Sequence, residues 1–141
     1  MKELTKQDLI DMNIRITKIG YNQFKIEHYS KKVYKSKEES WHEIKPVLNG
    51  KYHSKSGKTK YYYIVGWSHN GYPHSYPLQR VIYAWFNGCS HRLMDIDHIN
   101  NDPLDNDPSN LQELDRKSNL SKRTGYKNQY QALKDRGIEN E

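Results

Sequence analysis

The alternation of apolar and polar residues predicts short strands in the first part of the chain. Ile14–Ile19 and Phe24–Tyr29 alternate residue by residue, as strands with one exposed face do. A third short strand is expected at Val33–Tyr34. Ser36–Leu48 instead fits a helix with a capping box at its start and an Asn-Gly stop behind it. Residues 13–49 are therefore predicted to form a three-stranded meander followed by a helix.

The middle of the chain alternates between strand and helix signals. Tyr61–Trp67 is rich in aromatic and β-branched residues and is predicted to be a strand, which the Asn70-Gly71 pair ends in a tight turn. Pro77–Gly88 has the apolar spacing of a helix, with Gly88 as its C-terminal stop. Its core-facing residues are expected to be Val81, Ile82, Trp85 and Phe86.

The pattern after residue 93 predicts a strand, a loop, a second strand and a helix. Met94–Ile99 alternates in the manner of a strand, and the following residues are rich in Asn, Asp and Pro, which favour turns. Asn110–Leu114 is a second strand candidate. Asp115 is a favourable N-cap for a helix that starts at Arg116.

The ends of these elements carry residues suited to metal-assisted hydrolysis. Asp97 offers the hard oxygen that Mg²⁺ prefers, and the neighbouring His98 can act as a general base near neutral pH. Asn119 offers a second oxygen ligand, and Asn110 can accept a hydrogen bond from the far imidazole nitrogen and fix its tautomer. Asp95 faces the same way as Asp97 and is a spare carboxylate.

A purely structural reading stands beside this one, because Asp, Asn and Pro are the ordinary residues of loops. Asp102, Asp105 and Asp107 are expected to form turns or to be solvated. The four candidate residues of the site could likewise serve only to shape the loop.

The order of these residues resembles the HNH nuclease family, whose core is the ββα-metal motif. The resemblance spans Leu78 to Arg123 and rests on D-H, then N-L after the Asn/Asp/Pro loop, then S-N-L-S-K-R. It implies His98 as general base, a metal held by Asp97 and Asn119, and Asn110 bracing the loop and orienting His98. Many members carry His where this chain has Asn119, so it is similar to the H-N-N branch of phage and intron-encoded homing endonucleases. The implied cofactor is Mg²⁺, with Mn²⁺ as a substitute.

Charge distribution supports a polyanionic partner. The 141 residues carry a net charge of +6, and residues 1–60 contain 14 Lys and Arg against 7 Asp and Glu. Residues 61–141 contain 9 against 10, with the acids gathered in the loop. A basic body around an acidic pocket suits DNA held by its flanks. Predicted DNA contacts are Arg80, Arg116, Lys117, Lys122, Arg123, Lys25, Lys31 and Lys32. For the N-terminal residues, a supporting β-layer is the competing interpretation.

Composition excludes several other classes of protein. No apolar run is long enough to span a membrane and no signal peptide is visible, so a cytoplasmic location is expected, in the host cell if a phage encodes the protein. Cys89 is the only cysteine, which excludes an internal disulfide and a cysteine-rich zinc clip. Cys89 is expected to be a loop residue rather than a nucleophile. The remaining histidines without ligand spacing are expected at the surface or in turns: His53, His69, His74 and His91.

The sequence as a whole predicts an α+β protein, with a small antiparallel sheet plus helix before a ββα-metal nuclease core. The expected units are a basic N-terminal module (1–50) that reads DNA or supports the core, a basic linker (51–60), the nuclease domain (61–125) and a C-terminal helix or tail (126–141). The predicted function is metal-dependent DNA hydrolysis by a homing or nicking enzyme without a small-molecule cofactor. The alternatives are an inactive DNA-binding protein on the same fold, or an accessory nuclease that works with phage packaging proteins.

Overall fold

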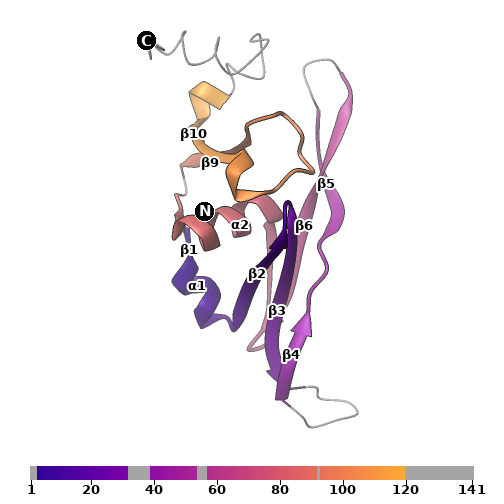
Figure 1. Ribbon diagram of the computed structural model, residues 1–141, viewed down its shortest axis with the longest axis vertical. Helices are drawn as coiled ribbons and strands as arrows, with labels where there is room; N and C mark the ends of the chain where they lie inside the picture. Colours follow the sequence, from indigo (N-terminus) through magenta and orange to yellow (C-terminus); the bar gives the residue numbers. More distant parts are fainter. Residues whose placement is uncertain (1–2, 32–38, 54–56, 92, 120–141) are drawn as a thin grey trace.

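The protein is an α+β structure in which small antiparallel sheets surround one central helix (Figure 1). The computed structural model describes residues 3–31, 39–53, 57–91 and 93–119. The predicted fold class is therefore confirmed. Within these residues no helix is long and apolar enough to cross a bilayer. The predicted C-terminal element, 126–141, lies outside them.

Two three-stranded antiparallel sheets are formed between Ile14 and Pro77. The strand order is β2-β3-β4 in one sheet and β5-β6-β7 in the other. The two meet where Ile14, Ile16 and Ile26 from the first sheet and Val65 from the second join a single apolar core. The strands are β2 (Ile14–Gly20), β3 (Gln23–Lys31), β4 (Glu39–Glu43), β5 (Val47–His53), β6 (Thr59–His69) and β7 (Tyr72–Pro77).

The helix predicted over Ser36–Leu48 is wrong in the part that the structure describes. β4 and β5 occupy its place, and the Trp41 ring of β4 packs against Tyr29 and beneath the Arg15 guanidinium, 3.9 Å from its centroid. Pro46 lies between the two strands, where it would have removed a hydrogen bond from a helix interior. Aromatic packing across the sheet thus overrides the local capping signal.

In the described part of the predicted linker, 51–53 and 57–60, most residues belong to strands. Residues 51–53 end β5 and residues 59–60 begin β6, and the two strands pair antiparallel with His53 opposite Thr59. The second strand of this hairpin continues directly into the strand predicted at Tyr61–Trp67. The division of the chain into separate domains remains a prediction.

Helix α2 (Leu78–Asn87) is the centre of the core, as its sequence predicts. Val81, Ile82 and Ala84 are fully buried, and the helix ends at Gly88, whose φ of 90° is a conformation that glycine adopts without strain. Phe86, predicted to be core, keeps 38% of its surface exposed at the helix end. The helix contacts the strands before it and those of the candidate site after it.

A short strand and a short helix near the N-terminus also pack against α2. Helix α1 (Lys6–Asp11) begins with a capping box in which Thr5 accepts a hydrogen bond from the backbone of Asp8, and the Asp8 carboxylate accepts one from the backbone of Thr5. Before it, strand β1 (Leu4–Thr5) pairs antiparallel with β8 (Cys89–Ser90). The start of the chain is therefore joined to the segment that enters the candidate site.

The predicted strand, loop, strand and helix are all present at the end of the described chain. β9 (Met94–His98) pairs antiparallel with β10 (Leu111–Asp115), and the loop between them ends in the 3₁₀ turn η1 (Pro108–Asn110). Residues 116–119 then begin a helix. Its N-cap is Asp115, whose carboxylate accepts hydrogen bonds from the Ser118 backbone at 2.7 Å and the Ser118 hydroxyl at 3.0 Å.

Candidate active site at the end of strand β9

His98 is the last residue of β9, and one buried amide holds its ring. The distance from His98 Nε2 to Asn106 Oδ1 is 2.8 Å, and Asn106 is 1% exposed. An amide oxygen only accepts hydrogen bonds, so this contact places the proton on Nε2 and leaves the lone pair on Nδ1. The arrangement prepares Nδ1 to accept a proton.

The surroundings keep this imidazole neutral. Burial lowers the pKa of His98 below its usual value, against the opposing effects of the Asn106 hydrogen bond and of the Asp97, Asp102 and Asp105 carboxylates. A histidine with a lowered pKa is unprotonated at neutral pH. His98 is therefore in the form that a general base requires.

Asn110 braces the loop instead of contacting the imidazole. Its Oδ1 accepts from the Asn100 backbone at 3.0 Å, and its Nδ2 donates to Asn100 Oδ1 at 3.0 Å and to the Asp105 carbonyl at 2.8 Å. The bracing part of its expected role is present in the structure. The hydrogen bond to His98 that was expected from Asn110 is made by Asn106.

Two carboxylates share one face of β9, and each is held by an amide. Asp97 is 8% exposed, and its Oδ2 accepts from Gln112 Nε2 of β10 at 2.8 Å. Asp95 Oδ2 accepts from Asn119 Nδ2 at 3.0 Å. Because residues two apart on a strand point the same way, Asn119 reaches the carboxylate next to Asp97 on the same face. The hydrogen bond joins Asn119 to the spare carboxylate rather than to Asp97 itself.

The donor set on this face fits a hard divalent cation. Asn119 uses its Nδ2 on Asp95, so its Oδ1 remains the atom with which it can act as a ligand. Together with the Asp95 and Asp97 carboxylates this gives an all-oxygen set, as Mg²⁺ prefers, with other positions left to water and substrate. The assignment of Asp97 and Asn119 as metal ligands remains a prediction, to which the structure adds Asp95 as a neighbour.

An open cavity of about 450 Å³ adjoins the Asp95–Asn119 pair. Its wall includes the Arg80 and Arg116 side chains, and Arg116 lies 3.5 Å from Asp95 with 75% of its side chain exposed. The exposed Arg116 guanidinium beside the Asp95 carboxylate is suited to binding a phosphate group at this opening. Among the residues that the structure describes, the lining is formed by Tyr62, Pro77, Gln79, Arg80, Asp95, Ile96, Arg116 and Asn119.

Hydrogen bonds from the tip of the β2–β3 hairpin hold the loop that carries Asn106. Asn22, at the hairpin turn, accepts from the Asn106 backbone at 2.8 Å and donates through Nδ2 to the Leu104 carbonyl at 2.9 Å. Tyr21 donates its hydroxyl to Asp105 at 2.8 Å. Residues more than eighty positions apart in sequence thus position the loop that orients His98 (Figure 1).

Two of the loop acids form turns, as expected, since Asp105 accepts from the Asp107 backbone and Asp107 from the Ser109 backbone. Both are buried, which corrects the alternative expectation that they are solvated. Asp105 is 8% exposed and Asp107 is 2% exposed. Although burial alone would raise it, the pKa of Asp107 lies well below its usual range because Ser109, the Asn22 backbone and Lys18 bind the carboxylate. Lys18 Nζ lies 3.0 Å from Asp107 Oδ1. The sequence could not predict that these carboxylates are buried, because their partners lie on the distant β2–β3 hairpin.

Removing the Asn22 side chain should weaken the attachment of the loop to the β2–β3 hairpin. We expect Asn22→Gly to destabilise the protein by about 2 kcal/mol, because two hydrogen bonds are lost, each contributing about 1 kcal/mol. Glycine tolerates the φ of 52° at this turn, so the substitution adds no backbone strain. Urea unfolding monitored by Trp fluorescence measures the change.

Asn70→Gly is the matched control, since Asn70 has the same φ of 52° at the turn of the β6–β7 hairpin. We expect it to change stability by less than about 0.5 kcal/mol, as substitutions at surface turns do. Equal losses in both variants would mean that the turn conformation, and not the contact with the loop, determines the effect.

The residues predicted to contact DNA differ in how exposed their side chains are. Arg80 is directed inward and donates to Ser90 Oγ at 2.5 Å and to the Met94 carbonyl at 3.1 Å, so it supports the entry to β9. Lys25 keeps 52% of its side chain exposed beside Glu27, and Lys117 is exposed. The Lys31 side chain and Lys32, Lys122 and Arg123 lie outside the described residues. The DNA-binding role of all eight remains a prediction.

Cys89 and His91 do not belong to this site. Cys89 lies on β8, and burial together with the Glu3 carboxylate raises its pKa to about 11, so the thiol is protonated at neutral pH. It is therefore no activated nucleophile. His91 is exposed, as expected, yet its Nδ1 lies 2.9 Å from Glu113.

Sequence reasoning missed three residues that support the site. Asn106 was read only as part of a turn, and nothing in its local pattern marks it as the partner of His98. Gln112 was detectable, because an antiparallel pairing that places His98 opposite Leu111 also places Asp97 opposite Gln112. Asn22 gives no local signal beyond a turn.

Comparison with known proteins agrees with this geometry. Residues 76–121 match a family model described as HNH endonuclease. This segment runs from the end of β7 through α2 and the β9–β10 pair to the helix of Asn119, so the family resemblance drawn from the sequence is confirmed. No curated protein and no solved structure matches the chain.

Proposed function

We propose that this protein, whose residues 76–121 match an HNH endonuclease family model, is a metal-dependent enzyme that hydrolyses phosphodiester bonds in DNA. One observation carries the proposal. His98, whose Nε2 is held by Asn106, ends the strand on which Asp95 and Asp97 share a face, and Asn119 hydrogen-bonds to the first of these two carboxylates. A neutral base beside an all-oxygen cation site is the requirement for activating water at a phosphodiester.

Each residue then has a defined task. His98 Nδ1 takes a proton from the attacking water, while the bond from Nε2 to Asn106 holds the ring and stabilises the imidazolium that forms. Asp97 and Asn119 would hold the cation, while Gln112 and Asp95 fix the orientation of these two side chains. When bound, the divalent ion polarises the phosphoryl oxygen and stabilises the leaving alkoxide. Arg116 lies where it can bind a phosphate of the substrate strand.

Incubation of supercoiled and linear DNA with the full-length protein tests the proposal. We expect cleavage with Mg²⁺ or Mn²⁺ and none in EDTA, and the ratio of nicked to linear product distinguishes a nicking enzyme from one that cuts both strands. DNA binding without cleavage under every metal tested would instead identify an inactive DNA-binding protein on this fold. Cleavage that requires an added packaging protein would identify an accessory nuclease. A homing enzyme of phage type is the finer assignment that site-specific cleavage would support.

The N-terminal half is proposed to hold DNA through its lysines. We expect the Lys25/Lys31/Lys32→Ala triple variant to bind DNA more weakly and with a smaller salt dependence, since each phosphate contact contributes roughly one unit to the log–log slope. Binding isotherms at several salt concentrations measure it. The metal requirement of cleavage should not change.

Lys45→Ala is a suitable control, because Lys45 is 82% exposed and pairs with Glu43, a neighbour on the same surface segment. An unchanged salt slope for the triple variant would place the DNA elsewhere. The grip of the β2–β3 hairpin on the loop would then be the function of this sheet, in agreement with the supporting-layer interpretation.

A further inference from the structure

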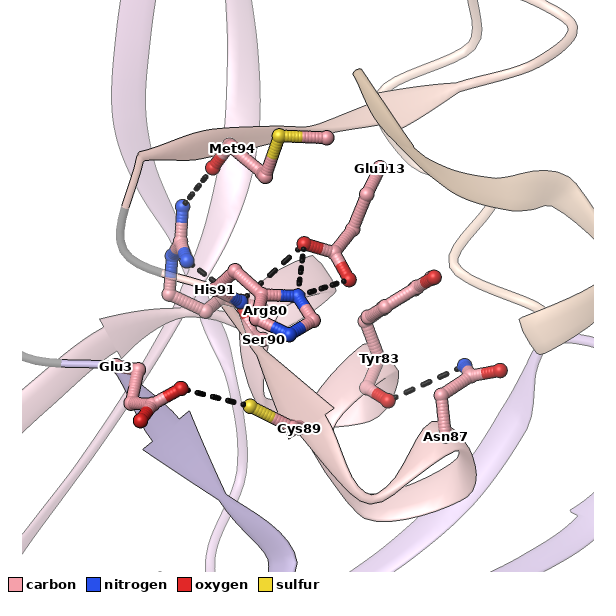
Figure 2. Close-up of polar contacts among 9 residues, drawn as sticks. All are labelled: Glu3, Arg80, Tyr83, Asn87, Cys89, Ser90, His91, Met94 and Glu113. Atoms are coloured by element: carbon pink, nitrogen blue, oxygen red, sulfur yellow. Dashed lines mark hydrogen bonds and ion pairs between the residues drawn. The ribbon is translucent and has the colours of Figure 1, made fainter. Parts of the chain in front are cut away.

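Three side chains with different donor atoms meet at the end of the strand pair β1–β8, separate from the carboxylates of β9. The carboxylate of Glu3, the thiol of Cys89 and the imidazole of His91 have ligand atoms within 4.8 Å of one another. Cys89 Sγ already donates a hydrogen bond to Glu3 Oε2 at 3.2 Å, as Figure 2 shows. A carboxylate, a thiol and an imidazole at this separation are the elements of a metal site.

The strand register explains why these three converge. β1 and β8 pair antiparallel with Leu4 opposite Ser90, so Glu3 comes next to His91 one step beyond the pair. Cys89 and His91 are two residues apart and point to the same side, while Ser90 between them is fully buried on the other. The ladder therefore presents all three donors on one outer face.

His91 is oriented by a second carboxylate in the manner of a metal ligand. Its Nδ1 lies 2.9 Å from both Glu113 Oε1 and Oε2, and its backbone amide donates to Oε2 at 3.2 Å. The Glu113 side chain is only 12% exposed, so it is a firm support. Figure 2 shows the other ring nitrogen on the edge away from Glu113. A carboxylate on one nitrogen fixes the tautomer and leaves the other nitrogen basic, as it does for zinc-bound histidines.

The distances suit a tetrahedral ion after small adjustments. Typical bond lengths in zinc sites give donor-to-donor separations of about 3.4–3.6 Å. The Cys89–Glu3 contact is within a few tenths of an ångström of that, and the longest separation, at most 4.8 Å, needs to shorten by no more than about 1.4 Å. Glu3 is exposed, so its side chain can move by changing rotamer, while a small rotation of the exposed His91 ring keeps its contact with Glu113. Water would complete the coordination.

We propose that Glu3, Cys89 and His91 bind one divalent ion of the zinc class, at a structural site separate from the nuclease centre. The mixed sulfur, nitrogen and oxygen set selects Zn²⁺, Co²⁺ or Ni²⁺ over Mg²⁺, which prefers oxygen alone. Binding converts the Cys89 thiol to a thiolate and releases its proton to solvent. The ion joins the N-terminal strand to the segment between α2 and β9, and through Glu113 to β10, so it stabilises the frame of the active site.

Titration of the full-length protein with Co²⁺, in an Asp97→Ala background that disables the β9 site, tests the proposal. We expect one equivalent to produce a thiolate-to-Co²⁺ charge-transfer band that millimolar Mg²⁺ does not displace. Cys89→Ser should abolish the band, and Glu3→Gln or His91→Gln should weaken Co²⁺ binding at least about tenfold. Glu113→Gln should keep the band but lower the affinity by about 10–100-fold, the usual effect of losing a supporting carboxylate.

Thermal unfolding gives an independent readout. Zn²⁺ should raise the melting temperature of the Asp97→Ala protein, and Cys89→Ser, a conservative change at a half-buried thiol, should remove that increase without altering the metal-free melting temperature. The proposal is overturned if no charge-transfer band forms, or if the band and the Zn²⁺ effect survive in Glu3→Gln and His91→Gln. Neither result depends on whether the protein cleaves DNA.

Discussion

His98→Ala should lower the rate of DNA cleavage by about two to four orders of magnitude, the usual contribution of a general base. DNA affinity should stay the same, since the imidazole is held within the protein by Asn106 and contributes no charge at neutral pH. Single-turnover cleavage at saturating enzyme, together with a binding isotherm in Ca²⁺ or EDTA, separates the two effects. Cleavage within a few-fold of wild type would contradict the mechanism proposed here.

The pH dependence of the same reaction should carry the signature of this histidine. Burial lowers the pKa of His98 from its usual value of 6.5, and the base is active only when unprotonated. The rate should therefore be constant through neutral pH and fall only as the pH drops below 6.5 through the lowered pKa. The residual cleavage activity of His98→Ala should no longer show this decrease at acidic pH.

Asn106 offers a variant that separates orientation from chemistry. Asn106→Ala removes the amide that holds Nε2 but leaves the base in place, so we expect a smaller loss than His98→Ala gives, and an altered pH profile. Asn22→Gly leaves the Asn106 side chain in place and removes the acceptor for its backbone, so it should reduce the cleavage rate less than Asn106→Ala does. A graded series would establish that the hairpin, the loop and the histidine act as one unit.

The sequence predicted the nuclease core well because its signals are local. Alternation over Met94–His98, turn residues in the loop and an N-cap at Asp115 each describe a few neighbouring residues, and the structure places each of these elements as predicted. The helix Leu78–Asn87 followed for the same reason. In these segments the pattern along the chain and the tertiary packing agree.

Contacts between distant segments are what the sequence did not yield. The hairpin turn at Asn22 contacts a loop more than eighty residues away in sequence. Neither segment has a sequence pattern that predicts its contact with the other. The helix expected at Ser36–Leu48 was wrong because a capping signal outweighed Pro46 and the strand-forming Trp41. The partners of Asn119 and His98 likewise depend on how side chains meet across the β9–β10 pair and its loop.

Metal preference should follow from the oxygen donors of the β9 face, and changing Asn119 should change it. We expect Mg²⁺ and Mn²⁺ to support cleavage and Zn²⁺ to support little or none, because an amide and carboxylates form a hard site. Asn119→Ala should shift the Mg²⁺ requirement to higher concentration. Asn119→His should favour Ni²⁺ or Zn²⁺, since imidazole nitrogen prefers these ions. Asp97→Ala should have the largest effect, because it removes a proposed carboxylate ligand that directly precedes the base in the chain.

The measurement is a titration of cleavage with each metal, in a Cys89→Ser background so that ions at the β1–β8 face do not contribute. Asp95→Asn is the informative companion, because it can keep a hydrogen bond to Asn119 while removing the charge. A small effect would make Asp95 a support for Asn119, and an effect as large as that of Asp97→Ala would make it a ligand. Identical metal profiles for wild type, Asn119→Ala and Asn119→His would mean that Asn119 binds no metal and serves only to attach the helix to β9.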